Sequence, residues 1–156
     1  MATARGKSLR DRLIHLVACA LTGAGLLLSA ASGPAQASGV IAKVSISQQK
    51  MEVTVNGRPT FEWKVSTGAP GYRTPKGMFK PTRMHRMWHS RKYDNAPMPH
   101  SIFFHGGYAV HATDAIKRLG RPASHGCVRL HPDDASDLFH LVKAFGQDQT
   151  TIMIVD

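Results

Sequence analysis

The sequence predicts a mainly β fold: a single β-sandwich or barrel-like domain with one principal helix near the C-terminus. Three observations predict it: short runs in which apolar and polar residues alternate, turn signals between these runs, and one helical pattern that starts near residue 131. The residues that follow an apolar N-terminal segment are numerous enough for one domain with a single core.

The first predicted strands form a hairpin. Residues 40–47 alternate between apolar and polar types, and residues 51–55 make a second run. Asn56-Gly57 then supplies a two-residue turn of the kind that joins antiparallel strands, and residues 61–66 are predicted as the return strand. Residues 67–77 contain three glycines and two prolines, so we expect a loop there.

The second half of the domain is predicted in the same way. Residues 78–80 begin another extended piece, and residues 101–104 and 108–111 are expected to pair around Gly106-Gly107. The helix should begin at the segment 131–134, because proline and acidic residues favour a helix N-terminus, and should end at Gly146. Residues 150–155 are predicted to form the last strand.

Residues 1–37 have the layout of a secretory signal peptide. Four basic residues precede an apolar stretch over 13–31, and Ala35-Gln36-Ala37 provides a cleavage signal. We therefore expect cleavage after Ala37 and an exported domain over residues 38–156, in the periplasm or cell envelope. Two alternatives stay open: the segment is retained as a membrane anchor, which would be the only membrane contact, or Cys19 belongs to a lipoprotein box. The apolar run continues to Leu28, which disfavours the lipoprotein box.

The chain is strongly basic, with a formal net charge of +10. A basic exported domain is suited to anionic envelope polymers or to a substrate that carries carboxylates. The sequence contains no RNA-reading aromatic signature, zinc-finger spacing or basic heptad helix, so we expect no nucleic-acid partner.

The segment Ser124-His125-Gly126-Cys127-Val128-Arg129 carries the predicted chemistry. The chain has two cysteines, and Cys127 alone lies outside the leader, in a compartment where unpaired thiols are rare. A thiol becomes an effective nucleophile when an imidazole takes its proton, and two candidates are His111 and His125. Gly126 permits a close backbone approach that lets its own N–H and that of Cys127 face an oxyanion, and Arg129 suits a carboxylate.

Structural interpretations of the same residues are also possible. Cys127 could be a buried core thiol, Arg129 a solvated charge, and Ser124 a group that satisfies the loop backbone. His125 could shape the pocket rather than transfer protons. His85 and His89 would share a face of a helix and could then hold a metal. No acidic third ligand accompanies them, so we expect neither a metal nor another cofactor.

The stretch from Val110 to Leu130 resembles the signature of the L,D-transpeptidase (YkuD-type) family. The segments 66–79 and 98–104 are similar to further family motifs, and the resemblance extends over about residues 40–156. The chain departs from the family pattern at Ala112, where glycine is common, and at His100, where an aromatic residue is common. The resemblance also implies that residues 80–95 form a loop lining the cleft.

The resemblance implies an enzyme that acts on peptidoglycan stem peptides as donor and acceptor. It implies Cys127 as nucleophile and His111 as general base and acid, with a backbone carbonyl near Ala112 orienting His111. His125 would shape the pocket or take part in proton transfer, and Gly126 would donate a hydrogen bond from its N–H to the oxyanion. The implied substrate-binding residues are Arg129, Ser124, Ala112, Met98, Ser101 and Phe103.

The implied reaction releases D-Ala from a tetrapeptide through a Cys127 thioester and forms 3–3 crosslinks in cell-wall biogenesis. L,D-carboxypeptidase trimming and transfer to a lipoprotein lysine are alternatives within the same chemistry. A non-catalytic, basic wall-binding module is the alternative of another class.

Overall fold

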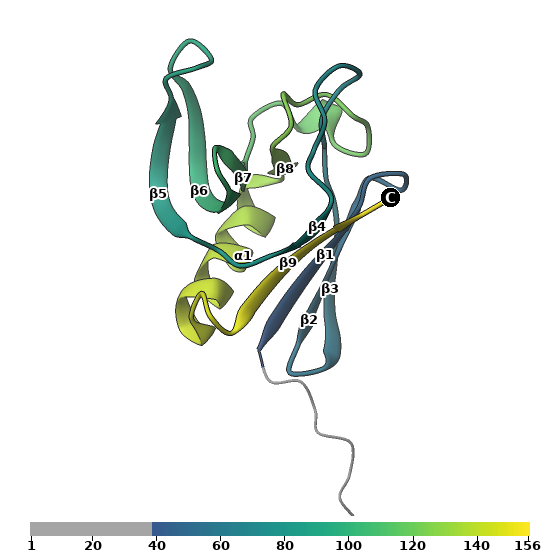
Figure 1. Cartoon of the computed structure of the whole chain (residues 1–156), viewed down its shortest axis with the longest axis vertical. Helices are drawn as coiled ribbons and strands as arrows, with labels where there is room; N and C mark the ends of the chain where they lie inside the picture. The colour runs from purple at the N-terminus through teal and green to yellow at the C-terminus, as the bar shows by residue number, and fades with distance from the viewer. Residues whose placement is uncertain (1–38) are drawn as a thin grey trace, which may run out of the picture. The chain divides into compact units, whose positions relative to one another are not determined.

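The computed structural model describes residues 39–156, and the predicted signal peptide lies outside the described residues. The described residues form two β-sheets and one α-helix, whose arrangement can be followed in Figure 1. The first sheet has five strands in the order β3 (Arg58–Lys64), β2 (Lys50–Val55), β1 (Val40–Ser45), β9 (Thr150–Val155) and β4 (Gly77–Phe79). The second sheet has the order β5 (Arg83–Ser90), β6 (Ala96–His105), β7 (Tyr108–Ala112) and β8 (Val128–Leu130). This arrangement confirms the mainly β fold with one principal helix.

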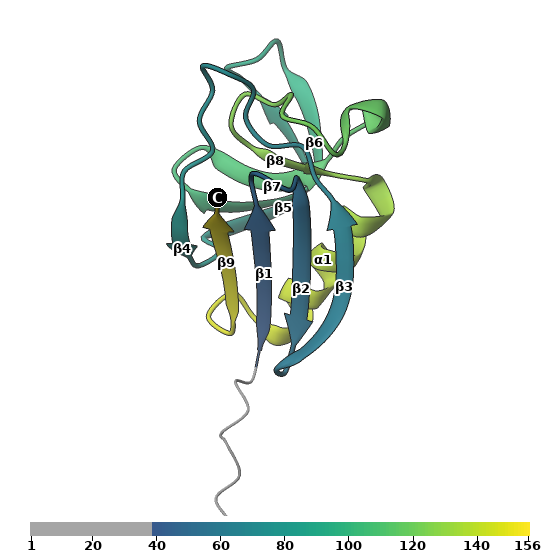
Figure 2. The same ribbon diagram turned by 90° about the vertical axis from the view of Figure 1, so that its right-hand side faces the viewer.

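The first sheet is built on the predicted hairpin. Asn56 and Gly57 have φ angles of 49° and 76°, the left-handed values that a two-residue hairpin turn requires, and they join β2 to β3. The return strand begins at Arg58, three residues before the predicted start. Strand β9 lies parallel to β1 and antiparallel to β4, so the last strand of the domain occupies an interior position of the sheet (Figure 2).

The second sheet corrects one expectation. Residues 83–90, expected within a loop that lines the cleft, form strand β5 and pair with β6 along its length. The segment contains no β-branched residue, so its local propensity for a strand is weak. Cross-strand contacts compensate: Trp88 packs edge-on against Phe103, and the Arg83 guanidinium lies 3.9 Å from the centre of the same ring. The pairing leaves residues 91–95 as the turn between the two strands.

The helix α1 (Pro132–Phe145) begins and ends where the sequence predicts. The His131 ring accepts a hydrogen bond from the Asp133 N–H, and Gly146 follows the last turn with a φ of 94°. The buried face of the helix packs mainly against β6 and β7. Full burial of a leucine such as Leu138 contributes about 1.5–3 kcal/mol. The helix and the main core cluster thus support the strands that carry the site.

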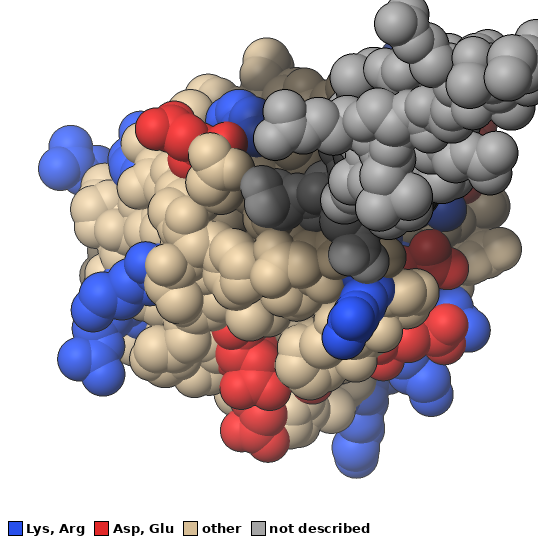
Figure 3. Space-filling view, turned by 90° about the horizontal axis from the view of Figure 1, so that it is seen from below, with Lys and Arg blue, Asp and Glu red and all other residues tan. Residues whose placement is uncertain are grey.

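Charges are distributed rather than gathered on the face drawn in Figure 3, where basic and acidic side chains alternate over the surface. Within residues 39–156, no helix combines the length and apolar character needed to cross a membrane.

Candidate active site

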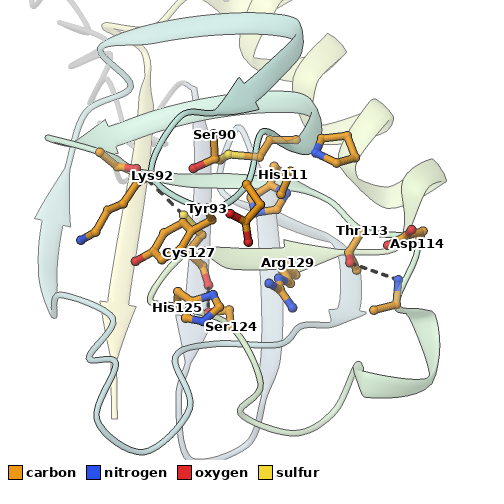
Figure 4. Close-up of a pocket in the computed structure, with 16 residues that line it drawn as sticks. Ser90, Lys92, Tyr93, His111, Thr113, Asp114, Ser124, His125, Cys127 and Arg129 are labelled. Atoms are coloured by element: carbon orange, nitrogen blue, oxygen red, sulfur yellow. Dashed lines mark hydrogen bonds between the residues drawn. The ribbon is translucent and has the colours of Figure 1, made fainter.

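One cavity of about 500 Å³ contains the predicted reactive groups (Figure 4). Three segments distant in the sequence line it, together with Gly107 of the β6–β7 turn: the β5–β6 turn region (90–98), the end of β7 with the loop that follows it (111–115), and the loop that leads into β8 (124–129). Cys127 and His111 both line this cavity. The structure therefore brings together the two residues that the sequence predicts as nucleophile and base.

Cys127 lies immediately before β8 and is the one cysteine among the described residues. Its Sγ is 4.0 Å from the carbonyl oxygen of Gly107. Burial raises the pKa of the Cys127 thiol, although a backbone hydrogen bond from Ala109 and the positive charge of Arg129 act in the opposite direction. The resting group is therefore the protonated thiol, which needs a base before it can act as a nucleophile.

His111 provides a neutral imidazole in this cavity. Its Nδ1 lies 2.7 Å from the carbonyl oxygen of Ala112, which can only accept a hydrogen bond, so Nδ1 carries the proton and Nε2 the lone pair. The pKa of His111 is lowered to about 4, mainly by burial; the Ala112 hydrogen bond opposes this shift and the charge of Arg129 adds to it. The ring is consequently neutral at pH 7, with Nε2 unprotonated.

The loop before Cys127 is organised by the hydroxyl of Ser124. Ser124 Oγ donates to the carbonyl oxygen of Cys127 at 2.6 Å and accepts from the Gly126 N–H at 3.0 Å. The Gly126 N–H is therefore engaged in this structure, in contrast to its expected role towards an oxyanion. The Cys127 N–H has no backbone hydrogen bond among the described residues, which leaves it the better placed donor of the two.

Gly126 is required at its position for two reasons. Its φ is 108°, a value that residues with a side chain rarely adopt. A Cβ at this position would lie 2.6 Å from Cε1 of Tyr108 and 3.1 Å from the carbonyl oxygen of Arg73. The tight turn at Gly126 also means that His125 and Cys127 do not lie on one extended segment.

The loop is anchored to the first half of the chain by contacts that the sequence analysis did not identify. Ser66 and Arg129 exchange backbone hydrogen bonds, and the carbonyl oxygen of Thr67 accepts from the N–H groups of residues 123 and 124. Thr67 is held in turn by the buried side chain of Gln49, which donates to Thr67 Oγ1 at 2.5 Å and accepts from the Thr67 N–H at 2.9 Å. Gln49 has a φ of 52° in a β-turn, and no local sequence signal marks this long-range role.

His125 lies at the rim of the cavity between two tyrosines. Its ring stacks on Tyr93 with centroids 4.4 Å apart and planes 15° apart, and Tyr72 meets the ring edge-on at 4.4 Å. This packing connects the β5–β6 turn to the loop that carries Cys127. The arrangement favours the pocket-shaping interpretation of His125.

The predicted substrate-binding residues fall into three groups. Arg129, Ser124 and Met98 line the cavity. Ala112 is buried and takes part through its carbonyl group. Ser101 and Phe103 are buried and do not line the cavity: Ser101 Oγ donates to the Met98 carbonyl oxygen, and Phe103 packs in a small core cluster.

The histidines outside the cavity lie in strand geometry. His85 and His89 both belong to β5, where four residues span about 13 Å, so the helical spacing that would bring them together is absent. In residues 39–156 no group of three or more His, Cys, Asp or Glu side chains is arranged to hold a metal ion.

The fold and the site together define a two-sheet β domain with a cysteine and a neutral histidine in one cleft. The profile of the L,D-transpeptidase catalytic domain (YkuD) matches residues 39–154. The chain therefore belongs to this family, as the sequence resemblance predicted.

Solved structures support the fold. An L,D-transpeptidase from Mycobacterium smegmatis is 22% identical, with a TM-score of 0.67 over 76% of this chain and 59% of that one. One from Stackebrandtia nassauensis is 26% identical, with a TM-score of 0.67 over 83% and 62%. L,D-transpeptidase 3 from Mycobacterium tuberculosis, solved with a faropenem-derived adduct, is 22% identical, with a TM-score of 0.65 over 76% and 60%. The chain thus spans about three fifths of these proteins. A search of curated protein sequences found no match.

Proposed function

We propose that this protein is an L,D-transpeptidase: a cysteine acyltransferase that cleaves D-Ala from peptidoglycan stem tetrapeptides and transfers the remaining tripeptide to an acceptor amine. Membership of the catalytic-domain family supports the reaction class. The observation that carries the proposal is the shared cavity of Cys127 and His111, with the His111 tautomer set by the Ala112 carbonyl.

The acylation step follows from the protonation states of the Cys127 thiol and the His111 imidazole. As Cys127 Sγ attacks the carbonyl carbon of the third stem residue, its proton passes to Nε2 of neutral His111. The Cys127 N–H is available to the oxyanion that develops on the carbonyl oxygen. The bond to D-Ala then breaks, His111 returns the proton to the leaving amine, and a thioester remains on Sγ.

The second step resolves the thioester. An amine of a neighbouring stem attacks the thioester carbonyl and gives its proton to His111, the carbon–sulfur bond breaks, and Sγ regains a proton. The product is a 3–3 crosslink. Water in place of the amine would give a free tripeptide, and a lipoprotein lysine would give a protein–wall linkage.

Mass spectrometry of the protein with purified disaccharide-tetrapeptide tests the proposal. We expect a crosslinked dimer that has lost one D-Ala, and no product from Cys127→Ala. Thermal unfolding of Cys127→Ala should match that of the wild type, which separates loss of chemistry from loss of fold. Products that survive the substitution would refute the role of Cys127. Binding of the substrate by both proteins without turnover would favour the wall-binding alternative.

We also propose that the protein acts in the cell envelope. The support is the signal-peptide pattern of residues 1–37 together with a substrate that exists only outside the cytoplasmic membrane in polymerised form. Mass analysis of the secreted protein, with cleavage expected after Ala37, tests this part.

A further inference from the structure

A second cavity, of about 460 Å³, lies outside the active site at the edge of the first sheet. Three segments contribute to its walls: residues 62–64 of β3, the short 3-10 helix Ile116–Arg118 with the residue that follows it, and the start of α1 at residues 131–134. None of the residues that line it belongs to the cavity of Cys127. The second cavity is therefore a separate candidate for a binding site.

Aromatic rings form one wall of the second cavity. Trp63 lies in β3, the edge strand of the sheet (Figure 2), and pairs across the ladder with the buried Met51. Because opposite residues share a face of a sheet, the indole lies on the core-facing side. Phe61 stacks on it with ring centroids 5.0 Å apart and planes 23° apart, yet 37% of Phe61 is exposed. Since α1 packs mainly against β6 and β7, this margin of the sheet keeps an accessible aromatic face.

The charged groups of the second cavity are balanced. Two cations and two anions line it, namely Lys64, Lys117, Glu62 and Asp134. Glu62 is paired with Lys50 at 2.6 Å, whereas within residues 39–156 the other three form no salt bridge. An aromatic face beside uncommitted donors and acceptors of balanced charge suits an uncharged ring with polar substituents. A sugar has this character, and a polyanion does not.

One short segment connects the two cavities. Asp114 and Ala115 line the active-site cavity. Ile116 and Lys117, which follow directly, line the second one. Two residues of chain span at most about 7 Å. In peptidoglycan, two stem residues and a lactyl group join the third stem residue to the sugar, a reach of about 10 Å when extended. A stem held beside Cys127 can therefore place its glycan at the second cavity.

We propose that the second cavity binds the glycan strand of peptidoglycan, with an N-acetylated sugar ring stacked on Trp63 and hydrogen-bonded to Lys117 and Asp134. The site rests on the proposed function and deepens it, because it names the part of the polymer that is held outside the active site. Capture of the glycan raises the local concentration of stems at Cys127 and leaves the chemical step unchanged. The site therefore acts on the KM for polymeric substrate and not on kcat.

The fluorescence of Trp63 gives a direct test. The chain has two tryptophans, Trp63 and Trp88, so Trp88→Phe leaves Trp63 as the only indole. The probe is the uncharged β-1,4-linked tetramer of N-acetylglucosamine. We expect a saturable change in Trp63 emission as the tetramer is added. Absence of any saturable change would overturn the proposal. A concentration-dependent dimer that Trp63→Leu abolishes would assign this face to a second copy of the chain, which would also overturn it.

Substitutions measured by calorimetry with the same tetramer identify the contacts. Trp63→Leu should weaken binding about 10- to 30-fold, whereas Trp88→Leu removes the other indole and should keep the affinity. Because Trp63 also packs against the main core, the exposed Lys117 provides a variant that leaves the core intact. Lys117→Ala should weaken binding about fivefold. Arg118→Ala removes a neighbouring exposed cation that does not line the cavity, and should have no effect. Full affinity in both Trp63→Leu and Lys117→Ala, or an equal loss in Arg118→Ala, would refute the site.

Turnover distinguishes this site from the proposed function. For Lys117→Ala we expect unchanged release of D-Ala from a tetrapeptide without sugars, and a KM about fivefold higher at constant kcat for tetrapeptides on long glycan strands. Release of D-Ala without any binding of the tetramer would leave the function standing and refute the glycan site. Binding of the tetramer at Trp63 without D-Ala release from any stem would refute the function and leave the sugar site standing.

Discussion

Replacement of Gly126 by alanine tests the backbone geometry of the site most directly. The backbone φ of 108° costs a residue with a side chain roughly 1–3 kcal/mol. The new Cβ would also lie 2.6 Å from Cε1 of Tyr108, and overpacking of this kind costs a further 1–3 kcal/mol or so. We therefore expect Gly126→Ala to lower the free energy of unfolding by roughly 2–6 kcal/mol.

The same substitution should affect activity more than stability. Cys127 is the next residue, and a displacement of about 1 Å in a reacting group costs about 100-fold in rate. The assay is release of D-Ala from the tetrapeptide, with stability measured by urea denaturation of the same samples.

Two variants separate backbone strain from the steric clash. Gly146→Ala carries comparable strain, with a φ of 94° and no atom within 4 Å of the new Cβ, and should lose stability while keeping activity. Tyr108→Leu combined with Gly126→Ala should recover the steric part of the loss. Wild-type activity in Gly126→Ala, or a loss in Gly146→Ala that equals it, would refute the reasoning.

Three further predictions concern the groups around the cavity. The folded pKa of His111, about 4, lies below the unfolded value of 6.5, so the unfolded chain binds more protons than the folded chain between these two pH values. The contribution of His111 to the free energy of unfolding is fully present above pH 6.5, and about 3 kcal/mol of it is lost as the pH falls to 4. Urea titrations at several pH values should show this slope, and His111→Gln should remove it. Ser124→Ala leaves the Gly126 N–H and the Cys127 carbonyl without their hydrogen-bond partner. We expect this variant to lose roughly 1–3 kcal/mol of stability and to release D-Ala about tenfold more slowly. Ser124→Thr, which keeps the hydroxyl, should retain more of the stability and more of the activity. Gln49→Leu removes the buried hydrogen bonds to Thr67 and should cost roughly 2–4 kcal/mol in chemical denaturation, whereas a cost below about 0.5 kcal/mol would contradict the anchoring role.

Local signals in the sequence were sufficient for much of the fold. Asn56-Gly57 predicts its hairpin because the left-handed turn depends on these two residues alone. The boundaries of α1 were predictable for the same reason, since Pro132 and Gly146 act on their own backbone. Strand β5 was missed because its stability comes from pairing with β6 and from the ring of Phe103, which local propensity does not encode.

The candidate site was predictable only in part. Cys127 and His111 stand in a motif specific enough to be identified, and the structure places both in one cavity. Gln49 carries no local signature, because it acts on Thr67, which lies 18 residues away in the sequence. Such roles arise from tertiary contacts and need the three-dimensional structure.

The interior position of β9 has a consequence for how the domain acquires its structure. Strands β1 and β4 have no direct pairing with each other, and residues 150–155 must enter between them before the sheet is continuous. A contact between residues 40 and 150 is among the most distant in the described sequence, and such contacts slow folding. A chain still emerging from the ribosome therefore lacks the strand that completes its larger sheet. The first sheet can therefore become continuous only after residue 155 has been synthesised.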